Sequence, residues 1–197
     1  MKTFLHAGCG SMYQRDLKGF AADQWCEIRF DIDRSVRPDI VGTLLDMRAV
    51  ATGSVDAVYS SHNIEHVFAH EVPAVLREFY RVLTDDGIVV LTCPDLRSVC
   101  KAVADDKLLE PLYQSPAGPI TPIDILYGYR DYIAGGNIHM AHKTGFTYSS
   151  LDRAFFDAGF KFNFGAARPD TYDLWIVSFK QPMSNEDGAR IAMNFLP

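Results

Sequence analysis

Phe4-Leu5-His6-Ala7-Gly8-Cys9-Gly10-Ser11-Met12 is the stretch that decides the fold. A short apolar run leads directly into two glycines that are separated by one residue. This pattern is typical of a β-strand that enters a backbone turn tight enough for a ligand to touch the main chain. An acidic residue, Asp31 or Asp33, follows a second strand-like run about 20 residues later. Glycine backbone beneath a ligand and a carboxylate beside a ribose form a nucleotide pocket, so the sequence predicts such a site here.

The bulk composition predicts one domain over residues 1–197, large enough for a single core. The formal net charge is −6 and no long run of Lys or Arg occurs, so nucleic acid is not expected as a partner. No window approaches the roughly 18 apolar residues of a membrane span, and the N-terminal apolar run is too short for a signal-peptide core. Four cysteines without paired spacing favour reduced thiols and a cytoplasmic location.

Apolar runs and turn residues predict alternating strands and helices. Residues 72–83 carry apolar side chains at helical spacing, and residues 150–158 form a second helix capped by Ser149 or Ser150. Residues 11–19 are predicted to be a turn and a poorly formed helix, and the polar tail after Pro182 has room for one short helix. The expected strands cover residues 3–7, 27–32, 40–45, 55–60, 88–93, 160–164 and 174–179.

This alternation predicts an α/β fold with a doubly wound, mostly parallel sheet. Such sheets bind ligands at the carboxyl ends of their strands. The polar and glycine residues expected at that edge are Gly8, Gly10, Asp31, Asp33, Asp46, Ser60 and Ser61. Residues 98–149 differ in character, because prolines alternate there with tyrosines. We interpret them as an inserted segment that lies over the sheet and covers the substrate.

Several motifs together resemble one family. The run 5–11 resembles motif I of class I S-adenosylmethionine-dependent methyltransferases, and residues 55–66 resemble the fourth-strand segment of their type 11 subgroup. Residues 76–83, 86–90, 93–96 and 150–160 are similar to that subgroup too. The resemblance covers most of residues 3–97 and resumes at about 144–180, so the inserted segment lies outside it.

The resemblance implies a Rossmann-like methyltransferase fold with a seven-stranded sheet whose last strand is antiparallel, and S-adenosyl-L-methionine as the cofactor. It places Ala7, Gly8 and Gly10 at the cofactor, with the two glycines under its methionine part, and Asp31 on the ribose hydroxyls. The remaining residues that it assigns to the cofactor are Asp46 on the adenine amino group, Met47 over the ring, and Ser61 with His62 beside the sulfonium. Two positions depart from the family pattern, because His6 stands where an acid is usual and Met12 where a glycine is usual.

The expected reaction is methyl transfer to an oxygen or nitrogen of a small molecule. The cofactor sulfonium is already a good electrophile, so the protein mainly aligns the nucleophile and excludes water. A general base helps only where the acceptor must lose a proton, and His62 and His142 are the candidates. No metal ligand is assigned.

Three alternatives remain open. In a nicotinamide oxidoreductase, Tyr13 would occupy the place of the third glycine of the dinucleotide fingerprint. A second alternative is a protein that binds the cofactor without catalysis. The third is a zinc hydrolase, because His62-x-x-Glu65-His66 matches the inverted zinc-protease motif, which needs both histidines on one face of a helix. We favour Glu65 and His66 as groups that orient the loop after the fourth strand.

Overall fold

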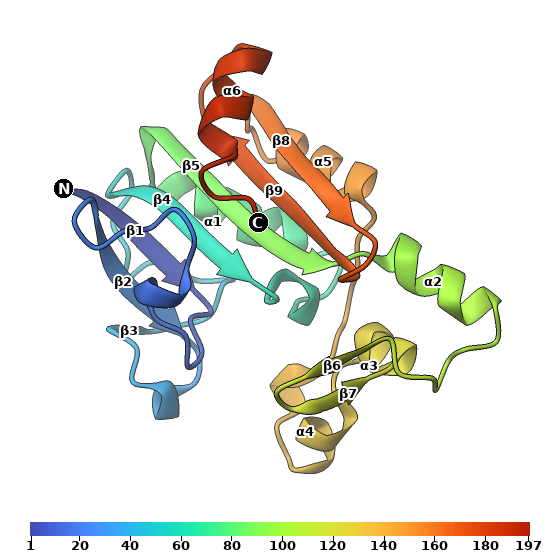
Figure 1. Ribbon diagram of the computed structural model, residues 1–197. Coiled ribbons are helices and arrows are strands. Elements are labelled where there is room, and N and C mark those ends of the chain that lie inside the picture. The colour runs from blue at the N-terminus through green and yellow to red at the C-terminus, as the bar shows by residue number, and fades with distance from the viewer.

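The computed structural model describes residues 1–197 and contains a seven-stranded sheet in the order β3-β2-β1-β4-β5-β9-β8 (Figure 1). Its strands are β1 (Lys2–Ala7), β2 (Trp25–Asp31), β3 (Ile40–Val41), β4 (Val55–Ser61), β5 (Leu83–Pro94), β8 (Phe162–Arg168) and β9 (Asp173–Phe179). The first five strands, β1 to β5, run parallel to one another, whereas β9 runs antiparallel between β5 and β8. The expected fold class is confirmed, including the antiparallel last strand.

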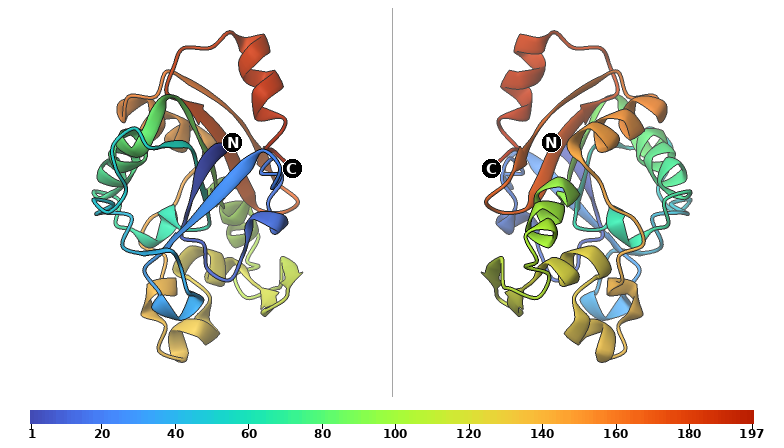
Figure 2. Two further views of the ribbon diagram at one scale, coloured as in Figure 1. Left: turned by 90° about the vertical axis from the view of Figure 1, so that its left-hand side faces the viewer. Right: turned by 90° about the vertical axis from the view of Figure 1, so that its right-hand side faces the viewer.

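Helices and a loop cover the two faces of the sheet differently (Figure 2). One face packs against α1 (Val72–Val82) and α5 (Tyr148–Asp157). The other face packs against the loop 11–24, the C-terminal helix α6 (Asn185–Ala192) and the residues that follow it. The short C-terminal helix was expected from the sequence. No helix of the chain combines the length and the apolar character needed to cross a membrane.

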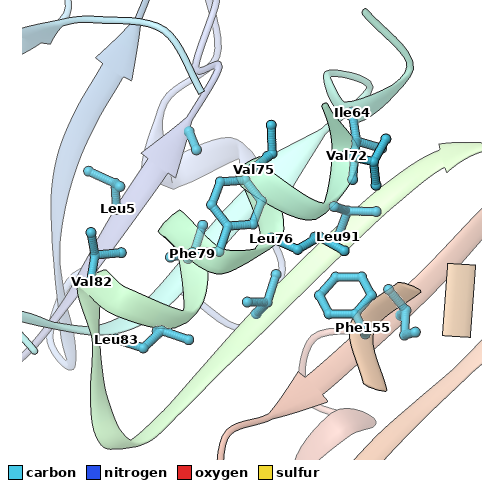
Figure 3. Packing of buried hydrophobic residues seen from close by; sticks show 14 of the residues in the cluster. Leu5, Ile64, Val72, Val75, Leu76, Phe79, Val82, Leu83, Leu91 and Phe155 are labelled. Carbon is cyan, nitrogen blue, oxygen red and sulfur yellow. The ribbon is translucent and has the colours of Figure 1, made fainter. Parts of the chain in front are cut away.

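Helix α1 forms because its apolar residues recur at helical spacing. Its buried side chains meet those of β1, β5 and α5 in the larger of two apolar clusters (Figure 3). The buried residues that α1 contributes are Val72, Val75, Leu76, Phe79 and Val82. On the far side of the sheet, the ring centroids of Phe20 and Phe4 lie 4.2 Å apart with the rings tilted by 33°, and Phe20 packs edge-on against Trp25.

The crossovers between the first strands contain no α-helix. Only the 3-10 turn η1 (Gln14–Asp16) follows β1, and only η2 (Arg34–Val36) follows β2. Leu17 and Phe20 are the buried residues of the loop 11–24, too few for an apolar helix stripe. The chain therefore covers this face with a loop.

The third strand is shorter than predicted and ends at Val41. Gly42 follows, where an added Cβ would lie 2.5 Å from the Phe30 ring, and the chain then turns from Thr43 to Asp46. The predicted strand end at Asp46 was therefore wrong. The predicted cap of α5 was also wrong, because Thr147 caps that helix by accepting a hydrogen bond from the Ser150 amide.

The inserted segment, residues 98–149, projects beyond the carboxyl ends of β4 and β5 (Figure 1). It includes most of α2 (Leu96–Ala104) and then a hairpin of β6 (Tyr113–Ser115) and β7 (Gly118–Ile120). It continues through α3 (Pro122–Tyr127), α4 (Arg130–Ala134) and the 3-10 turn η4 (Ile138–Met140). The chain then returns to the main body, where the Leu96 amide donates to the Phe146 carbonyl at 2.9 Å.

We expect Phe79→Ala to lower the free energy of unfolding by about 3–5 kcal/mol, because it empties a fully buried site in α1. Phe156→Ala is the matched control, since that phenylalanine of α5 is 44% exposed. Urea denaturation monitored by circular dichroism measures both variants. Equal losses would contradict the packing described here.

Candidate active site

The glycine turn after β1 has the backbone conformation that the sequence predicted. Gly8 and Gly10 have φ angles of +72° and +50°, in the left-handed region that favours glycine. An added Cβ on Gly8 would lie 2.1 Å from Oδ1 of Asn63, whereas nothing lies within 4 Å of one on Gly10. Gly8 thus allows close packing inside the protein, and Gly10 faces open space.

The Asp31 carboxylate holds this turn against the end of β2. One carboxylate oxygen accepts a hydrogen bond from the Gly10 amide and the other from the Asp33 amide, each at 2.8 Å. The side chain is nearly buried, and each oxygen keeps a further lone pair. Asp31 therefore lies beside the glycines, as a ribose-binding acid would, while Asp33 caps the next 3-10 turn.

Arg29 supports the turn from beneath and was not identified from the sequence. Its Nη2 donates to the carbonyl of Gly10 at 2.6 Å, and its Nη1 donates to the carbonyls of Val36 and Arg37 at 2.9 and 3.0 Å. This buried guanidinium also lies 4.2 Å from the centre of the Tyr13 ring. The only sequence signal for this role was an arginine inside a predicted strand. Its hydrogen-bond partners lie on two separate loops, so the sequence pattern did not reveal them.

A carboxylate also lies next to His6, where the family pattern has an acid. The buried His6 ring donates or accepts through Nδ1 at 2.7 Å from Oε1 of Glu27, a residue of β2. Oε2 of Glu27 accepts from the Gln14 amide at 3.0 Å. Burial lowers the pKa of His6, and the adjacent Glu27 only partly opposes this effect. The neighbouring strand therefore supplies the acid that β1 lacks.

Asn63 joins the glycine turn to the end of β4. Its Nδ2 lies 3.2 Å from the carbonyls of Ala7 and Gly8 and 2.8 Å from that of Ser61. Ala7 is buried at the end of β1 and Ser61 is half-buried at the end of β4. The structure thus brings Ala7, Gly8 and Ser61 together through a residue that the sequence analysis did not select.

Asp46 and Met47 do not join this group. The Asp46 carboxylate pairs with Arg48, whose hydrogen bond lowers the pKa of that carboxyl, and it lines a surface depression with residues of α1. The Met47 side chain is fully buried in the core, and its amide donates to Oε2 of Glu78 at 3.0 Å. Their contact with adenine stays a prediction.

A cavity of about 550 Å³ lies between the carboxyl ends of β4 and β5, the loop before β9, and the inserted segment. Its walls combine aromatic rings, carboxylates and imidazoles. Its lining includes His62, Glu65, His66, Tyr113, Asp124, Tyr129, His142 and Tyr172. A cavity of this size is typical of small-molecule sites.

Both candidate bases line this cavity. His62 has a φ angle of +53° and places Nδ1 at 3.4 Å from Oε1 of the buried Glu65. Burial disfavours its protonated form, but Glu65 outweighs that effect and raises the pKa of His62. Nδ1 of His142 donates to the carbonyl of Ile125 at 2.7 Å, and burial lowers the pKa of His142. The structure places the two imidazoles in one cavity, and their role as bases stays a prediction.

The segment 62–66 lacks the geometry of an inverted zinc-protease motif. It contains a single 3-10 turn, η3 (Ile64–His66), which His62 precedes in a left-handed conformation. The zinc-protease motif requires both histidines on one face of a helix, and His62 and His66 do not meet this requirement. The backbone of Glu65 does orient the loop, because its carbonyl accepts from the amides of Lys143 and Thr144 at 2.8 and 3.2 Å.

We expect Gly8→Ala to destabilise the protein more than Gly53→Ala. Both glycines have positive φ angles, so each substitution costs about 1–2 kcal/mol for the left-handed conformation. Only at Gly8 would the methyl group also displace Asn63, which adds about 1–3 kcal/mol of overpacking. Urea denaturation of the two variants measures the difference, and equal stability would argue against the Asn63 contact.

Comparisons with solved structures show the fold. A putative S-adenosylmethionine-dependent methyltransferase from Listeria monocytogenes aligns with a TM-score of 0.58 at 16% identity, over 91% of each chain. A methyltransferase of the same dependence from Methanosarcina mazei aligns with a TM-score of 0.60 at 15% identity, over 92% of this chain and 93% of that one. The CMeT domain of the citrinin polyketide synthase gives 0.57 at 11% identity, and 92% of this chain spans only 47% of that one.

The sequence itself matches a family. Residues 5–91, which extend from β1 into β5, match the family model described as "Methyltransferase domain". No curated protein matches the sequence significantly. The matched segment contains the glycine turn, Asp31 and the loop 61–66. Residues 5–91 are thus similar to the methyltransferase domain family, for which S-adenosyl-L-methionine is the expected cofactor.

Proposed function

We propose that this protein transfers a methyl group from S-adenosyl-L-methionine to an oxygen or nitrogen of a small molecule held in the 550 Å³ cavity. The observation that carries the proposal is the position of the loop 61–66. Asn63 packs on the glycine turn, while His62 and Glu65 line the cavity. One short loop therefore borders both the proposed cofactor site and the proposed acceptor site.

The residues around the turn suit the cofactor. The space over Gly10 is open, and the free lone pairs of Asp31 suit a ribose diol. We assign cofactor binding to Ala7, Gly8, Gly10, Asp31 and Ser61. Asp46 and Met47 rest on the family resemblance alone. When bound, the cofactor supplies a methyl group on a sulfonium, which is already a good electrophile.

The acceptor site suits a compact molecule with an apolar or aromatic part. Tyr113, Tyr129 and Tyr172 line the cavity from three separate segments and offer ring faces and hydroxyls. We assign to residues 98–149 the covering of the acceptor, since most of one wall comes from them. His142 carries a lowered pKa, so its imidazole is neutral at neutral pH and can accept a proton from the acceptor.

Binding of S-adenosylhomocysteine tests the cofactor assignment. We expect isothermal titration calorimetry to show binding to the wild type, and at least about tenfold weaker binding to Asp31→Asn, because one charged acceptor is lost. Asp23→Asn is the control, since Asp23 is exposed in the loop before β2. Absence of binding to a folded wild-type protein would overturn the proposed function.

Asp124 ties the inserted segment together and makes its stability sensitive to acid. It is buried and accepts hydrogen bonds from Arg130 at 2.7 Å and from the Thr121 hydroxyl at 2.6 Å. Burial opposes its ionisation, but these partners outweigh burial and lower the pKa of Asp124 from 3.8 to about 2. A carboxyl whose pKa is lower in the folded than in the unfolded state stabilises the fold at pH values above its unfolded-state pKa. This contribution is lost as the pH falls through the folded-state pKa.

We therefore expect Asp124→Asn to lower the free energy of unfolding by about 1–3 kcal/mol near neutral pH. The difference from wild type should stay constant above about pH 4 and shrink as the pH falls toward 2. Urea denaturation at a series of pH values measures it, with Asp131→Asn, an exposed acid of the same segment, as the control. A difference that does not change with pH would show that the Asp124 charge has no such role.

A further inference from the structure

We propose that Glu65, His66 and His142 form a binding site for a divalent transition-metal ion, with Zn²⁺ as the best fit, in the wall of the acceptor cavity. One ligand atom from each of the three side chains lies within 4.8 Å of the other two. Ligands about 2.0–2.2 Å from a tetrahedral zinc ion lie roughly 3.3 Å apart, so small side-chain rotations close the cluster around an ion. This proposal differs from the sequence analysis, which assigned no metal ligand.

The state of Glu65 points to a missing cation. The side chain is 1% exposed, and neither carboxylate oxygen has a hydrogen-bond partner. Its charged neighbour is the imidazole of His62, whose Nδ1 lies 3.4 Å from Oε1, within ion-pair distance but too far for a well-formed hydrogen bond, so the carboxylate can accept a closer partner. Buried carboxylates in proteins are paired or coordinate metals, because an unpartnered one is costly.

Both imidazoles have a backbone carbonyl beside Nδ1, which is a contact that metal-bound histidines usually make. Nδ1 of His66 lies 3.2 Å from the carbonyl of Ala141, and Nδ1 of His142 lies 2.7 Å from that of Ile125. A carbonyl only accepts, so each ring carries its proton on Nδ1. Nε2 is then left with the free lone pair, and ring orientation through a carbonyl is the usual outer-shell arrangement of metal-bound histidine.

The ligand set matches a catalytic rather than a structural site. Two histidines and one glutamate leave a fourth position on zinc for water or substrate, and all three side chains line the 550 Å³ cavity. Imidazole nitrogen favours zinc and similar ions over Mg²⁺ or Ca²⁺. The ion would also join the loop 61–66 to the end of the inserted segment.

This inference rests on the proposed function for its chemical consequence. With zinc bound, His142 would be a ligand and would no longer act as the base. An acceptor hydroxyl bound at the fourth position would have a lowered pKa and lose its proton to water in the open cavity. Its oxygen would then form a bond to the methyl carbon as the carbon–sulfur bond breaks, with the electron pair going to sulfur. The site thus favours an oxygen acceptor over a nitrogen acceptor.

Zinc titration of the chelator-treated, full-length protein tests the site. We expect calorimetry with ZnCl₂ to show one ion per chain, and at least tenfold weaker binding for His66→Ala, His142→Ala and Glu65→Gln. His70→Ala and His139→Ala are the matched controls, since both histidines are exposed and lie outside the cluster. Cobalt substitution supplies a second measurement, because tetrahedral Co²⁺ absorbs strongly in the visible range.

Each variant is also tested for folding by circular dichroism and for S-adenosylhomocysteine binding. If the cluster variants and the control variants lose zinc binding equally, or retain it equally, the proposed site is wrong. No zinc binding to a wild-type protein that still binds S-adenosylhomocysteine would overturn the metal proposal and leave the proposed function intact. Zinc binding to a wild-type protein that does not bind S-adenosylhomocysteine would overturn the proposed function and leave the metal site intact.

Discussion

The hydrogen bonding of one short loop, residues 61–66, is the constraint on which the site depends. On one side, Asn63 donates to carbonyls at the ends of β1 and β4. On the other side, the Glu65 carbonyl accepts from two consecutive amides, those of Lys143 and Thr144. Both contacts are hydrogen bonds to the main chain, so they fix direction as well as distance. The glycine turn and the inserted segment are therefore placed relative to each other by a single loop, and the cavity is the space that this arrangement leaves.

The same loop contains two features that cost stability. His62 has a left-handed backbone, which a non-glycine residue adopts only when its surroundings hold it there, and Glu65 is a buried carboxylate without a hydrogen bond. Both lie in the wall of the cavity, while the apolar clusters on either face of the sheet contain none of this strain. Local departures from stable geometry concentrate at functional sites, because the surrounding fold compensates for them. A bound cation would lower the second of these costs, since it would partner the carboxylate more closely than His62 does.

The sequence predicted those parts of the molecule that depend on local patterns. The spacing of Val72, Val75 and Phe79 produced α1, and the apolar run 88–93 lies inside β5, at the centre of the sheet. The glycine turn and its approach to Asp31 also followed from local spacing. The details that depend on long-range packing were missed. Gly42, which follows the short β3, packs against the Phe30 ring, and Arg29 binds carbonyls of two separate loops. His142 reaches the cluster only because the chain returns to His66 after 75 residues, as the contact with Ala141 shows.

The loop between β1 and β2 explains why charged side chains surround the glycine turn. In many nucleotide-binding folds, a helix begins after this turn, and its N-terminal amides help to hold the ligand. Here a 3-10 turn is the only helical element between the two strands, so that source of support is absent. Arg29 fixes the carbonyls of the turn, Asp31 accepts from the Gly10 amide, and Glu27 pairs with His6. All three residues come from β2, at alternate positions, and therefore point to one face of the sheet. One strand thus supplies, through side chains, the order that a helix would supply through its backbone, and the cofactor site that we propose depends on β2 as much as on the glycines themselves.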